Sequence, residues 1–534
     1  MSKRFPGRRL SIARLGIFSL LVVALVGAGL VGWGRFQDTR AAAATPSVFS
    51  GYVDVTATPT YAFENPVTPE GRSVVLSFVV ADPKNPCQPS WGGAYSLSGA
   101  ADSLDLDRRI ARLVQNGGRV AVSFGGLTNN ELATVCTDPA QLKAAYQSVV
   151  QRYSLSTIDL DVEGTALADT ASLQRRAAAI ASLQQDQKAA GKDLSVWLTL
   201  PVAPSGLTAE GQAAVQTTLA AGVDLAGVNI MTMDYGASRQ SGESMLQASK
   251  DAAEATHTQL DEVFRKAGAN YGSETLWRKI GLTPMIGQND VQGEILTLDD
   301  AAGLNAYARS KGVGRVSMWS LNRDATCSTN YPDLTRVSDA CSGVAQGPSH
   351  YATLLGQEVA AGPAASAAPV ATATGTPSAV VDDPATSPYP IWSPDFAYVA
   401  EDRIVWKHNV YQAKFWTRGD VPNDPIAQGA ATPWKLIGPV LPGDRPVPEV
   451  TAPTGTYPQW AATRIYNKGD RVMFEGHILE AKWWTQSSSP EAALQGSADS
   501  PWLKLKNADV EALLQQLSGQ GTASPTATTS AGRP

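Results

Sequence analysis

Short apolar runs alternate with longer amphipathic stretches between residues 46 and 350. Runs rich in Val, Ile and Leu predict strands, and the stretches between them have the spacing of helices. The candidate strands are VFSGYVDV (48–55), SVVLSFVV (73–80), RVAVSFGG (119–126), TIDLDVEG (157–164), LSVWLTLP (194–201), GVNIMTMDYG (227–236), KIGLTPMIG (279–287) and VGRVSMWSL (313–321). Eight such strands over roughly 300 residues predict an α/β fold, a (β/α)8 TIM barrel. An open doubly wound sheet is the alternative, disfavoured because no Gly-rich phosphate motif follows the first strand.

The C-terminal part of the chain contains a repeat. Adding 68 to a residue number in 389–440 gives its counterpart in 457–506, so that YQAKFWT (411–417) corresponds to LEAKWWT (479–485). Apolar and polar positions alternate in DRVMFEGHILEAKWW (470–484). This period of two predicts two small all-β modules, each a three-stranded sheet.

Segments poor in large apolar residues separate these blocks. Residues 351–388 and 441–456 are rich in Ala, Pro, Thr and Gly, and the tail at 507–534 ends in the same way. Such segments bury too little apolar surface to offset the entropy of ordering. We therefore expect a catalytic domain at 46–350, two linkers, modules at 389–440 and 457–506, and a low-complexity tail.

The N-terminal 45 residues have the pattern of an export signal. Five Lys and Arg residues lie in 1–14, and Leu15–Gly34 contains no charge. Twenty uncharged residues are long for a cleaved signal and long enough to span a bilayer, with the basic flank in the cytoplasm. We expect an uncleaved membrane anchor, with cleavage near Ala41–Ala44 as the alternative. In both cases the rest of the chain is extracellular, either secreted or tethered.

Charge and cysteine content narrow the possible partners. The net charge is −6 and no basic stripe is present, so nucleic acid is not an expected partner. The four cysteines form two local sets, Cys87 with Cys136 and Cys327 with Cys341, without the close spacing of zinc sites. Two disulfides are predicted, with free buried thiols as the alternative. We expect a monomer.

Three carboxylates alternate with apolar residues in STIDLDVEG (156–164). On a strand, Asp159, Asp161 and Glu163 share one face, which points into the barrel, and Glu163 stands at the strand end where barrel active sites lie. Like charges at this spacing oppose full ionisation, so at least one carboxyl group should keep a proton near neutral pH. The alternatives are a structural cluster or a divalent metal site.

These residues resemble the strand pattern of glycoside hydrolase family 18, the chitinase type. The family pattern D-G-x-D-x-D-x-E aligns with Ser156–Glu163, and SFGG at Ser123–Gly126 is similar to the family's S-x-G-G. MTMD at Met231–Asp234 is similar to M-x-Y-D, and Trp319 lies where the family's last strand supplies a tryptophan under the cleaved sugar.

The resemblance implies the role of each residue. Glu163 would be the general acid, Asp161 and Asp234 would handle the N-acetyl group, and Asp159 would tune Asp161. The remaining substrate-binding candidates are Ser123, Gly125, Met231, Met233, Tyr235 and Trp319. The sequence also departs from the pattern: Ser156 replaces its first Asp, and Met233 replaces a Tyr, for which the hydroxyl of Tyr235 would substitute. Trp319 has a core position as its alternative.

The strand geometry itself points to a mechanism. Two carboxylates on one wall cannot flank the scissile bond, as the usual glycosidase pair does. The attacking atom must come from elsewhere, and the 2-acetamido oxygen of the substrate is available. A retaining, substrate-assisted reaction is therefore predicted.

Eight of the thirteen tryptophans follow residue 390, in blocks too small to bury them all. The modules resemble the small chitin-binding modules of bacterial chitinases, whose A-K-W-W-T core matches AKFWT and AKWWT. The resemblance implies chitin-contacting positions at Trp416, Trp434, Trp483, Trp484 and Trp502, although some of each set must be core. A cell-wall or protein-interaction module is the alternative.

Together these features predict an extracellular chitinase that acts on chitin or a related N-acetylglucosamine polysaccharide. No cofactor and no metal are implied. Two alternatives remain, an endo-β-N-acetylglucosaminidase on glycans or peptidoglycan and a non-catalytic chitin-binding lectin.

Overall fold

The computed structural model describes residues 47–328, 336–361, 382–422, 432–446, 448–494, 497 and 499–520. The expected N-terminal anchor, most of the linker at 351–388 and the end of the tail lie outside these residues. Within the described part of the chain, no helix is both long and apolar enough to cross a membrane. The chain divides into two compact units, Met1–Thr372 and Ala373–Pro534.

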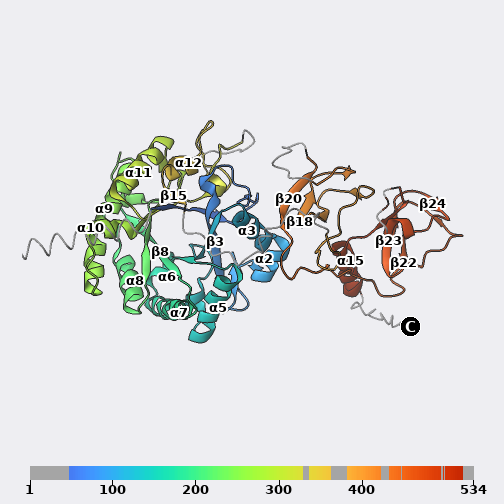
Figure 1. The fold of residues 1–534 in the computed structure, drawn as a ribbon, viewed down its shortest axis with the longest axis horizontal. Coiled ribbons are helices and arrows are strands. Elements are labelled where there is room, and N and C mark those ends of the chain that lie inside the picture. The colour runs from blue at the N-terminus through green and yellow to red at the C-terminus, as the bar shows by residue number, and fades with distance from the viewer. Residues whose placement is uncertain are drawn as a thin grey trace, which may run out of the picture. The chain divides into compact units, whose positions relative to one another are not determined.

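The first unit contains a closed barrel of parallel strands (Figure 1). Its strands are β1 (Val48–Phe49), β2 (Gly51–Asp54), β3 (Ser73–Ala81), β6 (Arg119–Gly125), β7 (Thr157–Asp161), β8 (Ser195–Ala203), β10 (Leu225–Met231), β11 (Ile280–Thr283) and β14 (Arg315–Val316). Neighbours pair in this order, and the consecutive segments β1 and β2 close the ring, because β1 pairs with β14 and β2 with β3. Counting β1 and β2 as one staggered strand gives the predicted (β/α)8 barrel, which is confirmed. Each of the eight candidate runs supplies one strand of this ring.

Helices follow most of the strands and lie outside the ring in Figure 1. They are α2 (Leu97–Ser103), α3 (Leu106–Gln115), α4 (Leu132–Val135), α5 (Pro139–Arg152), α6 (Gly164–Ala168), α7 (Thr170–Ala189), α8 (Ala209–Ala220), α9 (Met245–Lys266), α10 (Ser273–Arg278), α11 (Leu298–Lys311) and α12 (Tyr351–Gly356). Side-chain caps fix several starts: Asp138 caps α5, Ser244 caps α9, and Thr297 forms a capping box with Asp300 on α11. Gly312 ends α11 in the left-handed conformation.

Shorter elements complete the first unit. They are β4 (Pro89–Trp91), β5 (Tyr95–Ser96), β9 (Gly206–Leu207), β12 (Gly287–Gln288), β13 (Ile295–Leu296) and β15 (Ala360–Ala361), with 3-10 helices at Glu70–Arg72, Gly236–Ser238 and Leu321–Arg323. Both predicted disulfides are present, Cys87–Cys136 and Cys327–Cys341. The first joins the segment before β4 to the residue after α4. The second closes a short loop after β14.

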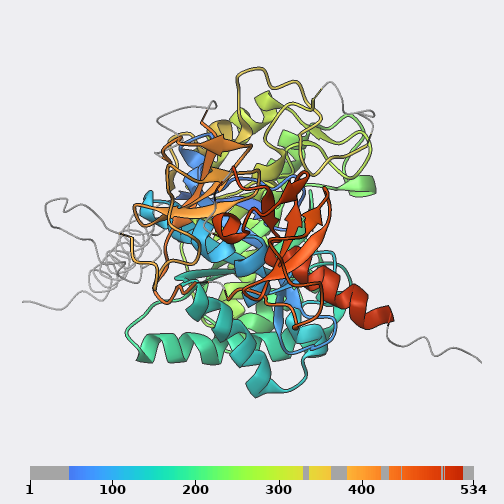
Figure 2. The same cartoon turned by 90° about the vertical axis from the view of Figure 1, so that its right-hand side faces the viewer.

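The second unit is built from small antiparallel sheets, drawn in orange to red in Figures 1 and 2. One module pairs β17 (Arg403–Trp406), β18 (Asn409–Ala413) and β20 (Trp434–Pro439), and the other pairs β22 (Arg471–Phe474), β23 (His477–Ala481) and β25 (Trp502–Lys504). These are the three-stranded sheets predicted from the repeat. Two-stranded ribbons accompany them, β16 (Ala397–Tyr398) with β19 (Thr417–Arg418) and β21 (Ile465–Tyr466) with β24 (Thr485–Gln486). The second module also contains two helices. Helix α14 (Glu491–Leu494) lies between β24 and β25, and helix α15 (Asn507–Gln520) follows β25.

One glycine allows two barrel strands to approach. Gly125 ends β6 with φ of +108°, and a Cβ atom there would lie 2.0 Å from the carbonyl oxygen of Asp161 on β7. Gly117 also has a positive φ, +75°, but no atom lies within 4 Å of its would-be Cβ. The two positions therefore separate the cost of backbone conformation from the cost of a clash.

We expect Gly125→Ala to lower the free energy of unfolding more than Gly117→Ala does. The control should cost about 1–2 kcal/mol from backbone conformation alone, and the clash with the strand carbonyl should add about 1–3 kcal/mol. Urea denaturation followed by tryptophan fluorescence measures both. Equal losses in the two variants would show that β6 and β7 do not need this close approach.

Candidate active site

The acidic face of β7 rises from the barrel interior to its mouth. Asp159 is fully buried, Asp161 is nearly so, and Glu163, two residues beyond the strand, is half-buried. The extended backbone of Glu163, with φ −144° and ψ 178°, continues the alternation of the strand. Backbone bonds on both sides hold this segment, because the amide of Gly126 donates to Asp161 (3.2 Å) and that of Val162 donates to Thr199 (3.0 Å). The three carboxyl groups therefore share one wall, as the sequence predicted.

Asp159 is enclosed by donors from the other strands. Its Oδ2 atom accepts hydrogen bonds from the hydroxyls of Tyr52 (2.8 Å) and Ser123 (2.7 Å). Its Oδ1 atom accepts from the hydroxyl of Thr199 (2.7 Å) and from Nη1 of Arg315 (2.9 Å). Asp159 and Arg315 thus form a buried ion pair in which every lone-pair direction of the carboxylate is used.

A second layer of polar side chains locks these donors in place. Nδ2 of Asn229 donates to the hydroxyls of Tyr52 (3.2 Å) and Thr199 (3.0 Å), and its Oδ1 accepts from the hydroxyl of Thr283 (2.8 Å). The two hydroxyls also lie 3.1 Å from each other, and each donates to Asp159. The network joins strands β2, β6, β7, β8, β10, β11 and β14 across the barrel.

Asp161 has a different environment although it lies only two residues away. Its Oδ1 atom is buried and has no hydrogen-bond partner within the described residues. Burial raises the pKa of Asp161 well above its ordinary value, and the charges of Glu163 and Asp159 raise it further, while Arg315 opposes them. This carboxyl group has an unused acceptor that faces the same side of the barrel as Glu163.

Glu163 is the most accessible of the three acids. Burial raises its pKa to about 7, and the negative charge of Asp234 contributes to the rise. The raised pKa values of Asp161 and Glu163 agree with the prediction that at least one carboxyl group keeps a proton near neutral pH. A carboxyl group that titrates close to neutral pH can donate a proton and take it back.

Asp234 follows β10 and is held in a left-handed conformation, with φ of +52°. Its amide donates to Oδ1 of Asn289 (3.3 Å), and its own Oδ1 accepts from the amide of Val291 (3.1 Å). Glu294 fixes the next turn by accepting from the amides of Tyr235 and Gly236, each at 2.9 Å. Burial is the largest cause of the raised pKa of Asp234. The loop after β11 therefore positions this carboxylate.

Three of the predicted substrate-binding residues have other roles. The hydroxyl of Ser123 is fully buried and bonded to Asp159, below the mouth of the barrel. Gly125 provides the close approach of β6 to β7. Tyr235 is buried and its hydroxyl donates to Ser249 of α9 (3.4 Å), so the predicted substitute for the missing tyrosine hydroxyl points away from the site. The assignments of Ser123 and Tyr235 were wrong because the motif fixes a residue's position but not the direction of its side chain, and that of Gly125 stays a prediction.

The other predicted residues of the last strands remain at the mouth. Met231 is half-buried and Met233 is 8% exposed. Trp319 is half-buried, with one face stacked on Phe78 at a ring distance of 5.3 Å and the ring of Tyr52 6.0 Å away. The tryptophan is therefore supported from behind and not enclosed, which fits a platform better than a core position.

The five tryptophans predicted to contact chitin divide into three exposed and two buried side chains. Trp416, Trp483 and Trp484 are exposed to 62%, 47% and 59%. Trp434 and Trp502 are fully buried, and their indole N–H groups donate to backbone carbonyls of Asp420 and Ser488, each at 2.8 Å. The prediction that Trp434 and Trp502 contact a ligand was wrong, since they form the module cores. The exposed partner of Trp416 is Phe415, at the position that corresponds to Trp483.

Sequence reasoning missed the residues that support the acids. Tyr52, Thr199, Asn229 and Arg315 were not singled out, although each is a polar residue in an otherwise apolar candidate strand. Inward alternation along each strand could have identified them: Arg315, Ser317 and Trp319 occupy alternate positions, as Asp159, Asp161 and Glu163 do. Glu294 does not lie in a candidate strand, so alternation along a strand could not have identified it.

The metal-site alternative finds no support in the arrangement of ligands. Among the described residues, no cluster of three or more His, Cys, Asp or Glu side chains is placed to hold a metal ion. The guanidinium group of Arg315 provides the positive charge beside Asp159. An arginine at this place would repel a cation bound to the same carboxylate.

Comparisons with known proteins find similar sequences for both parts of the chain. Residues 459–503 match the model of carbohydrate-binding module family 5/12. The chain is 38% identical over 261 residues to "Probable bifunctional chitinase/lysozyme" of Escherichia coli (strain K12), covering 48% of this chain and 28% of that protein. It is 36% identical over 255 residues to "Endochitinase 11" of Metarhizium anisopliae, covering 47% of each. The chain thus spans less than half the length of these curated relatives.

A solved structure, the catalytic domain of a hyperthermophilic chitinase from Pyrococcus furiosus, aligns with a TM-score of 0.48 and 25% identity. The alignment covers 58% of this chain and 94% of that chain. These sequence matches agree with the resemblance of the strand motifs, and residues 459–503 match the kind of carbohydrate-binding module predicted for the second small block.

We expect Glu163→Gln to stabilise the chain at pH 8 and to leave its stability at pH 4 unchanged. The folded-state pKa of Glu163 is raised from 4.5 to about 7. The stability that its proton provides is complete below pH 4.5 and is lost as the pH rises through 7, whereas the amide of the variant stays neutral at every pH. Thermal unfolding at both pH values measures the difference.

Glu210→Gln, at an exposed position in the first turn of α8, is the matched control; it should leave the unfolding temperature at pH 4 unchanged and should lower that at pH 8 slightly, opposite in sign to Glu163→Gln. A Glu163→Gln effect of the same size at pH 4 and pH 8 would mean that the carboxyl group is not desolvated.

Proposed function

We propose that the chain is a glycoside hydrolase of family 18 that carries a family 5/12 carbohydrate-binding module, and that it hydrolyses the β-1,4 bonds between N-acetylglucosamine units of chitin. The observation that supports this activity best is the pairing on one wall of two acids with raised pKa values. Glu163 stands at the barrel mouth and titrates near pH 7, and Asp161 beside it has an acceptor atom without a partner among the described residues.

The reaction begins with proton transfer from Glu163 to the glycosidic oxygen. As the bond between the anomeric carbon and that oxygen breaks, the carbonyl oxygen of the 2-acetamido group bonds to the anomeric carbon from the opposite face. The acetamide nitrogen gains positive charge, and its N–H donates to the free Oδ1 of Asp161. Glu163, now a carboxylate, takes a proton from water, which attacks the anomeric carbon and releases the acetamide. Two inversions give a product with retained configuration.

The placement of the other carboxylates supports the substrate as the source of the nucleophile. Asp159 is fully buried and bonded to four donors, so it cannot reach a sugar. Asp161 lies on the same wall as Glu163. Asp234 is tied by the amide of Val291, and its charge helps to raise the pKa of Glu163. In this proposal Asp234 keeps the acid protonated and contacts the acetamide group from the end of β10, which β8 separates from β7 in the barrel.

Trp319 provides the platform for the sugar whose bond is cleaved. Its supported ring offers an apolar face to the C–H groups of a pyranose. Met233, in place of the family's tyrosine, contributes apolar contact to the acetamide methyl group and no hydroxyl. Acetamide orientation then depends on Asp161 and Asp234 more than in relatives with the tyrosine.

The modules hold the enzyme on an insoluble polymer. Exposed adjacent aromatics, Phe415 with Trp416 and Trp483 with Trp484, form a stacking surface in each module. Two weak sites on one chain increase overall affinity without new contacts, because the second binding step becomes intramolecular. The export pattern of residues 1–45 and the two disulfides support an extracellular location, with the chain tethered to the membrane if the segment is uncleaved.

A related activity remains a second candidate. The Escherichia coli relative is named for both chitinase and lysozyme activity, and peptidoglycan also contains N-acetylglucosamine with a 2-acetamido group. Assays on chitin, peptidoglycan and N-glycoprotein side by side separate these substrates.

We expect Glu163→Gln to reduce chitin hydrolysis by at least about 100-fold and to leave chitin binding intact, because the variant loses the proton donor and keeps the modules. Release of soluble oligosaccharide and pull-down on chitin measure the two effects. Glu210→Gln is the control, and unchanged turnover by Glu163→Gln would refute the assignment. Equal wild-type rates on chitin and on its de-acetylated form would refute the substrate-assisted route.

We expect the double variant Trp416→Ala with Trp484→Ala to weaken binding to chitin at least tenfold while leaving the module folds unchanged. Both rings are exposed, so their removal eliminates stacking surface and little core. Binding isotherms on chitin beads measure affinity, and circular dichroism measures folding.

Ile465→Ala tests a similarly exposed apolar side chain, 52% accessible, outside the aromatic pairs. If it weakens binding as much as the tryptophan variant does, the aromatic surface is not the chitin contact.

A further inference from the structure

A cavity of about 730 Å³ opens at the end of the barrel opposite the active site. Its walls come from the first residues of the strands, among them Val48 of β1, Ser73 of β3, Arg119 of β6, Ser195 of β8 and Leu225 of β10. Because the strands are parallel, this is the N-terminal face, whereas Glu163 follows the C-terminal end of β7. The cavity is therefore separate from the proposed catalytic site, and its size is within the range of small-molecule pockets.

Positive charge predominates along the cavity walls. The charged lining residues are Arg119, Lys188, Lys192, Arg278, Lys279 and Arg315 against Asp193 and Asp224. Asp159 neutralises Arg315, and a clear excess of cations remains. Such walls favour an anionic ligand over a cation or a neutral sugar.

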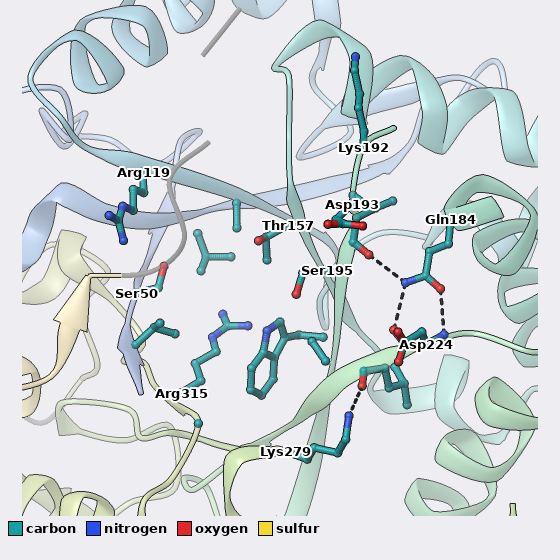
Figure 3. Close-up of a pocket in the computed structure, with 18 of the residues that line it drawn as sticks. Ser50, Arg119, Thr157, Gln184, Lys192, Asp193, Ser195, Asp224, Lys279 and Arg315 are labelled. Carbon is teal, nitrogen blue, oxygen red and sulfur yellow. Dashed lines mark hydrogen bonds between the residues drawn. The ribbon is translucent and has the colours of Figure 1, made fainter. Parts of the chain in front are cut away.

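Two polar atoms in the cavity wall are buried and have no hydrogen-bond partner within the described residues. Arg315 uses Nε for Ser317 (2.8 Å) and Nη1 for Asp159 (2.9 Å), which leaves Nη2 without an acceptor. The hydroxyl of Thr157, at the start of β7, also lacks a partner. Figure 3 shows the guanidinium group of Arg315 directed into the space bordered by Ser50, Thr157 and Ser195. Buried donors in proteins nearly always form hydrogen bonds, so both groups are available to donate to an acceptor on a ligand.

The same cavity offers apolar surface beside these donors. Val74, Val120 and Trp197 contribute to its walls, and the guanidinium carbon of Arg315 lies 5.5 Å from the ring centre of Trp197. A bare inorganic ion would leave most of this surface uncovered. A carboxylate attached to an apolar body matches both parts of the wall.

We propose that this cavity is a binding site for a small organic carboxylate, held by Nη2 of Arg315 and the hydroxyl of Thr157, with its apolar body against Trp197. The proposal does not depend on the hydrolytic activity, since binding is measured without chitin. Arg315 connects the site to the catalytic strand, because the same guanidinium group holds Asp159.

The test uses isothermal titration of the full chain with three probes at constant ionic strength and pH 7. Benzoate has the charge and an apolar ring, benzamide has the same shape without the charge, and inorganic phosphate has charge without an apolar body. We expect benzoate to bind at least tenfold more tightly than benzamide and at least threefold more tightly than phosphate. Benzoate no better than benzamide, or no heat from benzoate, overturns the anion site, and phosphate tighter than benzoate overturns the organic ligand.

Thr157→Val locates the site without disturbing the ion pair of Asp159. The substitution keeps the shape of the side chain and removes the hydroxyl, so we expect benzoate affinity to fall at least threefold. Thr258→Val, on the exposed surface of α9, is the matched control and should leave the affinity unchanged. Equal affinities in Thr157→Val and Thr258→Val would place benzoate elsewhere and overturn the assignment. Arg315→Lys, which keeps a cation beside Asp159, should weaken benzoate further because its single nitrogen replaces the separate nitrogens that contact Asp159 and the ligand.

Discussion

The interior of the barrel is organised around one buried ion pair, Asp159 with Arg315. A charge in a protein interior is costly unless a partner and hydrogen bonds compensate it. Here the carboxylate receives hydrogen bonds from Tyr52, Ser123, Thr199 and Arg315, each from a different strand. Removing any one partner leaves buried polar atoms unsatisfied. The pair therefore fixes how the strands approach each other where the barrel would otherwise be filled by aliphatic side chains.

The same pair explains why neighbouring acids on one strand behave differently. Asp159 receives four hydrogen bonds, and no donor in the described part of the chain reaches Oδ1 of Asp161, two residues nearer the mouth. Asp161 is left with burial and like charge, which raise its pKa. Glu163, at the end of the same wall, has a pKa near neutral. Along one strand, the carboxyl groups thus change from a fully hydrogen-bonded anion, Asp159, to an acid that holds a proton near neutral pH, Glu163. The residues that face the strand cause this change.

In the modules, the small size of the core determines which aromatic side chains are buried and which are exposed. Trp434 is buried with Tyr398 and Tyr411 in the first module, and Trp502 is buried with Tyr466 in the second. The indole N–H of each tryptophan is bonded to a loop carbonyl. The aromatics that follow β18 and β23 then have no interior to enter. Their exposure is a consequence of the small core, and it leaves the paired rings free to stack on a sugar.

The sequence by itself determined which strands form, their inward-facing acids, the cysteine pairs and the repeat, because these follow from local periodicity and from spacing along the chain. It could not determine what faces each acid. Tyr52, Thr199 and Arg315 reach Asp159 across 40 to 156 residues of chain, and only closure of the barrel brings them together. The direction of Tyr235, the burial of Trp434 and the cavity beneath Arg315 were likewise decided by packing, since a side chain's orientation depends on neighbours that local sequence does not specify.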